Sequence, residues 1–140
     1  MVELELKQGA GDPRRLSLEE NEKGLGQFHY RVGSRSHKWR PATDVYETEE
    51  AFVVRVEIAG MQDGEFTITL DERTVTIQGS RPDRDERRAF HQMEIRYGEF
   101  STSVELHWPI DSEAVEAEYA DGILRLVLPK AVPHEIRIGK

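Results

Sequence analysis

The sequence predicts an all-β chain that folds as an antiparallel β-sandwich. Its 140 residues contain roughly seven or eight short runs in which apolar and polar side chains alternate. Alternation with a period of two is typical of strands that bury one face, and no segment sustains the longer period of a helix. Turn residues separate the runs at regular spacing, which is the pattern of a sandwich.

Residues 115–130 carry the clearest of these patterns. Apolar residues alternate up to Asp121 and again after Gly122. An Asp-Gly pair between two such runs predicts a β-hairpin, because a tight turn requires positive φ and glycine adopts it freely. The second strand is apolar on both faces apart from Arg125, so we expect an inner strand covered on both sides and ended by Pro129.

The other expected strands lie upstream of this hairpin. In order, they are residues 44–47, 51–59, 65–70, 74–78, 89–95 and 100–106. Within 51–59, the alternate residues starting at Phe52 share the face that we expect to be buried. Residues 80–88 are charged and contain proline, which predicts a long exposed loop. Residues 111–114 predict one helical turn.

The first 40 residues are expected to form a flexible, partly apolar arm. Residues 1–7 alternate and predict either a short strand or a segment that pairs with an exposed sheet edge. Residues 16–20 predict the start of a short helix, with Ser17 as the N-cap and Glu20 three residues later. Large apolar residues recur in the arm, which favours an interaction role over a leader without a role. They are Leu16, Leu18, Leu25, Phe28, Tyr30 and Trp39.

The last ten residues, 131–140, predict an extension without a core of its own. Ile136 and Ile138 flank Arg137 and project from the same side of an extended chain, about 7 Å apart. Burying both side chains in a groove would contribute ~3–6 kcal/mol of transfer free energy. The cost of ordering the tail cancels much of this gain, so such a contact is weak alone and useful when an assembly repeats it.

Composition argues against several classes of function. Lys and Arg number 19 and Asp and Glu 27, and a net charge of −8 repels phosphate backbones, so nucleic acid is not an expected partner. No apolar run has the length of a membrane span. The first residues lack the basic and then apolar order of a signal peptide, and without cysteine there is no thiol chemistry. We therefore expect a cytoplasmic protein.

The residues predict neither an enzyme nor a cofactor site. Nucleophile-elbow and phosphate-binding glycine motifs are absent. The five histidines lack the spacing of metal ligands, so we expect no metal site and place them at the surface or the edge of the core. They are His29, His37, His91, His107 and His134.

Five short motifs, in consistent order and spacing, together indicate a known family. Residues 44–48 match D-[IV]-Y-E-T, and residues 56–60 match a strand that ends in I-A-G. Residues 97–100 match Y-G-x-F, and residues 136–138 match I-x-I. Ala117, Gly122 and Leu124 match A-x-x-x-x-G-x-L. From about residue 39 onward, the chain resembles the small heat-shock proteins, the Hsp20/α-crystallin domain family.

This resemblance implies an architecture and a function. It implies an immunoglobulin-like sandwich, the α-crystallin domain, at residues 41–130, with an N-terminal arm at 1–40 and a C-terminal extension at 131–140. It implies an ATP-independent chaperone, a holdase that binds partly unfolded client proteins and prevents their aggregation under stress. It also implies that the chain binds itself, in homodimers that exchange the loop strand and in larger homo-oligomers.

The resemblance further implies that the I-x-I tail docks in a groove of a neighbouring subunit. Carried over to this sequence, the groove has one side from the strand at 65–70 and the other from the strand that precedes the Asp-Gly turn. Its lining would be Phe66, Ile68, Leu70, Val115, Ala117 and Tyr119. Which face of each strand points into the groove is left open by the sequence.

Two departures from the family pattern concern the strand after Y-G-x-F. Family members commonly carry an arginine there, whereas this strand has Thr102, Ser103 and Glu105. Residues 107–109, His-Trp-Pro, replace a plain Leu-Pro. We therefore expect altered dimer contacts, with other arginines as substitutes. The candidates are Arg96 and the loop residues Arg84, Arg87 and Arg88.

A second function on the same sandwich stays open, because a fold does not determine a function. It is a p23-like co-chaperone, or another non-catalytic binding module that docks one folded partner. The I-x-I tail and the apolar arm favour the holdase. A strict monomer that protects no unfolded client would favour the alternative.

Overall fold

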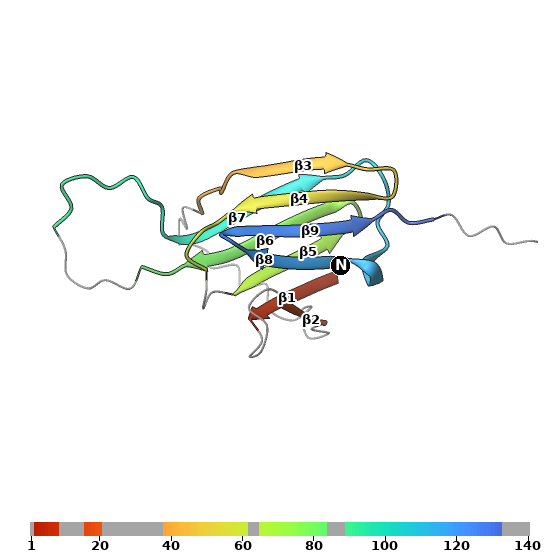
Figure 1. Ribbon diagram of the computed structural model, residues 1–140, viewed down its shortest axis with the longest axis horizontal. Coiled ribbons are helices and arrows are strands. Elements are labelled where there is room, and N and C mark those ends of the chain that lie inside the picture. The colour runs from red at the N-terminus through yellow and green to blue at the C-terminus, as the bar shows by residue number, and fades with distance from the viewer. Residues whose placement is uncertain (1, 9–15, 21–37, 62–64, 84–88, 133–140) are drawn as a thin grey trace, which may run out of the picture.

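The protein is a β-sandwich of two sheets (Figure 1). The computed structural model describes residues 2–8, 16–20, 38–61, 65–83 and 89–132, with the backbone alone at residues 5–8 and 16–20. All neighbouring strands within the sheets pair antiparallel. The prediction of an all-β antiparallel sandwich is confirmed.

The two sheets have the strand orders β2-β1-β5-β6-β7 and β3-β4-β9-β8. The strands of the first are β1 (Val2–Gln8), β2 (Leu16–Glu20), β5 (Phe66–Asp71), β6 (Thr74–Arg81) and β7 (Gly98–Glu105). Those of the second are β3 (Thr43–Glu47), β4 (Ala51–Glu57), β8 (Glu116–Ala120) and β9 (Ile123–Pro129). The predicted helical turn is the 3₁₀ turn η2 (Ser112–Ala114), which Asp111 caps by accepting a hydrogen bond from the Glu113 N–H.

The core lies between the sheets and consists of the residues that alternate inward. On β4, Val54 and Val56 are fully buried, as the alternation predicted. Val53 points to the opposite face and is still only 3% exposed, because it stands between Tyr46 of β3 and Val127 of β9. β4 therefore buries more than the single face that its pattern predicted.

The hairpin of β8 and β9 forms as the Asp-Gly pair predicted. Asp121 has φ 52° and Gly122 has φ 78°, which are the two positive values that a type I′ turn requires. β9 pairs with β4 on one side and β8 on the other, so it is the inner strand that was expected. Pro129 is its last residue.

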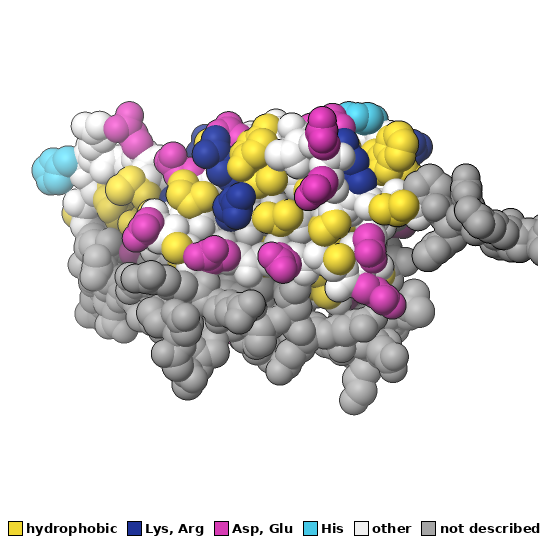
Figure 2. Space-filling view, turned by 45° about the vertical axis from the view of Figure 1, so that its right-hand side comes forward, with side chains coloured by type: hydrophobic (Ala, Val, Ile, Leu, Met, Phe, Trp, Pro, Cys, Tyr) yellow, Lys and Arg dark blue, Asp and Glu magenta, His cyan; other side chains and the backbone are white. Residues whose placement is uncertain are grey.

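The outer face of β9 differs from the prediction. Ile123 and Val127 are only partly buried and Arg125 is exposed, so the expectation of cover on both faces is wrong. The reason is that, within the described residues, no further layer of strands lies on this face. Figure 2 shows apolar side chains lying among acidic and basic ones on the side of the molecule that it draws.

Two other predicted elements are corrected by the structure. Residues 16–20, expected to begin a helix, form strand β2, because β1 offers a pairing edge that sets Leu6 opposite Leu18. Residues 89–95, expected to be a short strand, have no strand structure, because the described parts of the β6–β7 connection run away from the sandwich and meet no sheet edge (Figure 1).

β1 fulfils both alternatives predicted for the first residues. It is a strand, and it pairs with the edge of β5. Part of the segment expected to be an arm thus continues the five-stranded sheet. The division at residues 40 and 130 stays a prediction.

Candidate functional site

The residues predicted to line the tail groove come together on one side of the sandwich interior. Phe66, Ile68 and Leu70 of β5 are at most 5% exposed, so this is the face of β5 that points inward. Tyr119 of β8 faces them from the other sheet, with its ring centroid 5.2 Å from that of Phe66. Val115 is buried as well, and Ala117 packs against the same core and is partly buried.

Tyr119 is held by its hydroxyl as well as by its ring. The hydroxyl donates a hydrogen bond to the carbonyl oxygen of Ile58 (2.7 Å) and accepts one from the N–H of Met61 (3.3 Å). All these groups are buried, and a buried polar group without a partner is costly. The two bonds therefore fix β8 to the chain that follows β4.

The first residues of the chain lie beside the gap between β5 and β8. β1 lies along β5 with Val2 opposite Leu70 and Leu4 opposite Ile68. Leu4 is 7% exposed and belongs to the core, and Val2 packs against the core. β2, paired with β1, contacts β8. The gap between β5 and β8 is thus bordered by the β1–β2 pair.

The I-x-I residues Ile136 and Ile138 lie outside the described residues, but the start of the C-terminal extension is anchored. Lys130 N–H donates to the carbonyl oxygen of Glu50 (2.9 Å), and Ala131 N–H donates to that of Pro109 (2.8 Å). The indole N–H of Trp108 donates to the carbonyl oxygen of Ala131 (3.1 Å). Val132, the next residue, is 80% exposed. The anchorage therefore ends at Ala131.

Side chains reinforce this anchor. Glu47 of β3 accepts from Lys130 Nζ (2.6 Å) and pairs with His107 Nε2 (3.2 Å). The hydrogen bond from Lys130 is the main cause that lowers the pKa of the Glu47 carboxyl below its ordinary value, and His107 adds to it. Lys130 Nζ also lies 5.3 Å from the ring centroid of Phe52.

The anchor was missed as a functional feature from the sequence. The sequence feature that could have predicted the anchor is the replacement of a plain Leu-Pro by residues 107–109, His-Trp-Pro. We interpreted this replacement only as a departure from the family pattern. In the structure, Trp108 holds Ala131 directly, and His107 contacts Glu47, the carboxylate that accepts from Lys130.

The edge of β3 is the second candidate interaction surface. β3 pairs with β4 on one side, and no described strand pairs with its other side. Val45 is 42% exposed and Tyr46 40%. Arg55 of β4 pairs with Asp44 (3.0 Å) and lies over the Tyr46 ring. An edge of this kind is a template for pairing with another strand.

The connection between β6 and β7 also exposes apolar side chains. Phe90, Met93 and Ile95 are 49%, 58% and 62% exposed. The base of the connection is held more firmly, because Arg81 lies over the rings of Trp39 (4.6 Å) and Tyr97 (5.4 Å). Arg81 Nε also donates to the carbonyl oxygen of Arg96 (2.8 Å).

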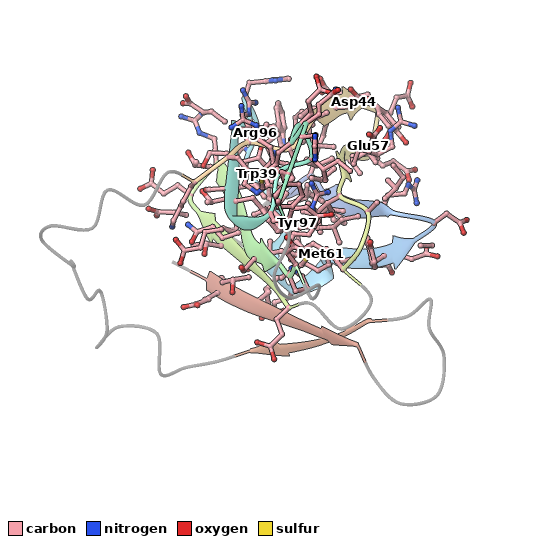
Figure 3. The ribbon with its side chains drawn as sticks, turned by 90° about the vertical axis from the view of Figure 1, so that its left-hand side faces the viewer. Trp39, Asp44, Glu57, Met61, Arg96 and Tyr97 are labelled. Atoms are coloured by element: carbon pink, nitrogen blue, oxygen red, sulfur yellow. The ribbon has the colours of Figure 1, made fainter. Side chains whose placement is uncertain are left out.

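Trp39 is fixed to the sandwich at this base. Its ring packs against Phe100 with the centroids 5.7 Å apart, and its indole N–H donates to the carbonyl oxygen of Gly98. It lines an open hollow of about 570 Å³ together with residues 93–97. Figure 3 shows Trp39, Arg96 and Tyr97 at this end of the molecule.

The remaining arm residues are less completely described. Leu16 and Leu18 lie in β2 with only their backbone described, and Leu25, Phe28 and Tyr30 lie outside the described residues, as do Arg84, Arg87 and Arg88. Their roles stay predictions. On β7, Thr102 is buried and shares a hydrogen bond with the Thr43 hydroxyl (2.8 Å), so this position is already satisfied within the chain.

The part of the chain that the structure describes contains no group of His, Asp or Glu side chains arranged to hold a metal ion. Nor does it contain a helix long and apolar enough to cross a membrane. The contacts found here are those of strand edges and apolar surfaces.

Comparisons with known proteins agree with this architecture. The sequence model of the Hsp20/alpha crystallin family matches residues 44–140. Two proteins of Rickettsia felis are similar: "Small heat shock protein C2" is 32% identical over 92 residues (64% of this chain, 60% of that protein), and "Small heat shock protein C4" is 31% identical over 108 residues (76% and 66%). The chain thus spans somewhat less than two thirds of either relative.

A solved structure agrees as well. The small heat-shock protein of Xylella fastidiosa matches with a TM-score of 0.58 at 26% identity, over 74% of this chain and 99% of that one.

Proposed function

Because the chain belongs to the Hsp20/alpha-crystallin family, we propose that it is an ATP-independent holdase, a chaperone that binds partly unfolded proteins and prevents their aggregation. The observation that carries the proposal is apolar surface exposed at two places, the β3 edge and the β6–β7 connection. Val45 and Tyr46 at the first place and Phe90, Met93 and Ile95 at the second are between 40% and 62% exposed. Exposed apolar residues near one another mark surfaces that bind other chains.

The decisive test is light scattering from thermally unfolding malate dehydrogenase, with and without this chain and without ATP. We expect scattering to be suppressed at near-stoichiometric ratios of subunit to client. Unchanged scattering at every temperature tested, from a chain that remains monomeric, would exclude the holdase and favour the p23-like module.

The same surfaces support self-association into homodimers and larger homo-oligomers. The edge of β3 that no described strand covers offers backbone groups for pairing, while residues 89–95 have strand-like composition and belong to no strand in the part of the chain that the structure describes. If this segment paired with β3 of a second copy, the backbone N–H and C=O groups of both segments would gain hydrogen-bond partners. This pairing would also cover Val45, Met93 and Ile95, which are exposed in the single chain.

The tail would link such dimers. We propose that Ile136 and Ile138 dock between β5 and β8 of a neighbouring subunit. The double substitution Ile136→Ala plus Ile138→Ala should then reduce the mass of the oligomer in multi-angle light scattering, whereas Arg137→Ala, in the same tail, should leave it unchanged. An unchanged mass for the double variant would exclude tail docking as the assembly contact.

A further inference from the structure

Two segments at opposite ends of the chain share one pattern. Residues 2–6 read Val-Glu-Leu-Glu-Leu, and residues 136–138 read Ile-Arg-Ile. In both, branched aliphatic side chains two positions apart flank a charged one, so an extended backbone places the aliphatic groups on one side and the charge on the other. Either segment therefore fits a surface that offers apolar contacts beside a strand edge.

In the structure, the first of these segments lies along a strand edge beside apolar side chains of the core. Leu4 of β1 stands opposite Ile68 of β5 and contributes to the core at 7% exposure. Glu3, opposite Thr69, is on the alternate side of the strand and is partly exposed. The backbone of β1 pairs with β5 over five residue positions, from Val2 opposite Leu70 to Leu6 opposite Phe66.

Only one strand at a time can pair with this edge of β5. The backbone N–H and C=O groups on the free side of β5 can pair with one added strand and no more. β1 also brings β2 with it, and β2 reaches β8 in the opposite sheet. The β1–β2 pair therefore covers the gap between β5 and β8 in which the tail is proposed to dock.

We propose that β1 and the C-terminal tail are alternative occupants of the β5 edge, so that the chain's own N-terminal strand must leave before a tail docks. This inference rests on the proposed docking of the tail between β5 and β8. The N-terminal strand then sets the affinity for the tail: a closed state keeps β1 in place, and an open state exposes Ile68 and its neighbours to the tail of another subunit. Conditions that release β1 favour linkage between subunits.

A reversible lock on β1 tests this directly. The natural chain has no cysteine, so Glu3→Cys plus Thr69→Cys introduces one pair, at positions directly opposite on antiparallel strands. Cα atoms of such pairs are about 4.5–5.5 Å apart, which a disulfide spans. The variant is made in the full chain with Ile136→Ala and Ile138→Ala, which removes the chain's own competing tail. Binding of a fluorescein-labelled peptide of residues 131–140 is then followed by anisotropy.

We expect the peptide to bind the reduced protein and to bind the oxidised protein at least tenfold more weakly. A matched control is Thr76→Cys plus Ser103→Cys, which bridges β6 and β7 at another opposed pair and should not affect binding. Equal binding to the oxidised and reduced forms would overturn the inference and leave tail docking intact. Absence of binding to both forms would overturn tail docking and the inference together, and the light-scattering assay of holdase activity would still be judged separately.

A second variant gives the opposite change and needs no disulfide. Leu4→Asp removes a buried side chain from β1 and should release the strand, which tightens peptide binding roughly ten- to a hundredfold, the range expected for one buried leucine. Glu3→Gln, on the exposed side of the same strand, should leave the affinity unchanged. An affinity of the Leu4→Asp variant equal to that of the Glu3→Gln variant would also overturn the inference.

Discussion

Removing the hydroxyl of Tyr119 tests how β8 is fixed beside the proposed groove. Tyr119→Phe keeps the ring that packs 5.2 Å from Phe66 and deletes only the bonds to Ile58 and Met61. The carbonyl oxygen of Ile58 and the N–H of Met61 would then be buried without their partner. One buried group left in this way costs about 1–3 kcal/mol, and because the 3.3 Å bond from Met61 is long, we expect a total of about 2 kcal/mol.

Urea denaturation at a fixed subunit concentration measures this loss. With a slope of about 2 kcal/mol per molar urea, the midpoint should fall by about 1 M while the slope stays the same. Tyr46→Phe is the matched control, since its hydroxyl belongs to an exposed side chain (40%) and its loss should cost less than 0.5 kcal/mol. The reasoning is refuted if the two variants unfold at the same urea concentration.

Three further changes have expected outcomes of their own. Gly79→Ala places a Cβ 2.6 Å from Phe100 Cζ and 2.8 Å from the Glu65 carbonyl oxygen, so we expect a loss of about 1–3 kcal/mol in urea denaturation; Ser80→Ala on the same strand should cost little. Trp108→Phe deletes the hydrogen bond from the indole N–H to the Ala131 carbonyl oxygen. Hydrogen exchange of the Ala131 amide should then be faster, while global stability falls by no more than about 1 kcal/mol. An exchange rate at Ala131 equal to that of the natural chain would contradict the anchor. Because the folded-state pKa of Glu47 is lowered, its contribution to stability is present above the unfolded-state pKa and is lost as the pH falls through the folded-state value. Glu47→Gln should remove that part of the acid-side slope in pH-dependent unfolding, and an unaltered slope would argue against the ion pairs.

The parts of the fold set by local chemistry were predictable. The Asp121-Gly122 turn needs two positive φ values, and the sequence supplies the residues that adopt them at this place. Alternation on β5 likewise placed Phe66, Ile68 and Leu70 on one face, and the structure shows that this face points inward. Such features are determined by residues close in the sequence, so they can be predicted without knowledge of the tertiary structure.

The parts that failed depend on contacts with other segments of the chain, which a local sequence pattern does not encode. Residues 16–20 carry a helix-start pattern, yet β1 provides an edge and they form a strand. Residues 89–95 have strand composition, and within the described residues they pair with no sheet edge. The contacts that anchor the extension join three places far apart in the chain, which are the end of β3 with the turn after it, the segment after β7, and the residues after β9. The periodicity of apolar residues does not predict which segments of the chain come into contact.

The pairing of β1 with β5 also has a consequence for biosynthesis. Leu4 and Ile68 are 64 positions apart in the chain, and a ribosome adds about 5–20 residues per second. β1 is therefore complete about 3–13 s before its edge of β5 exists. Of its two neighbours in the folded sheet, only β2 is present during that interval, and an isolated two-stranded hairpin is marginally stable in water. On a polysome, where nascent copies lie close together, the glutamates at positions 3 and 5 give neighbouring β1 segments like charges that oppose their pairing with one another.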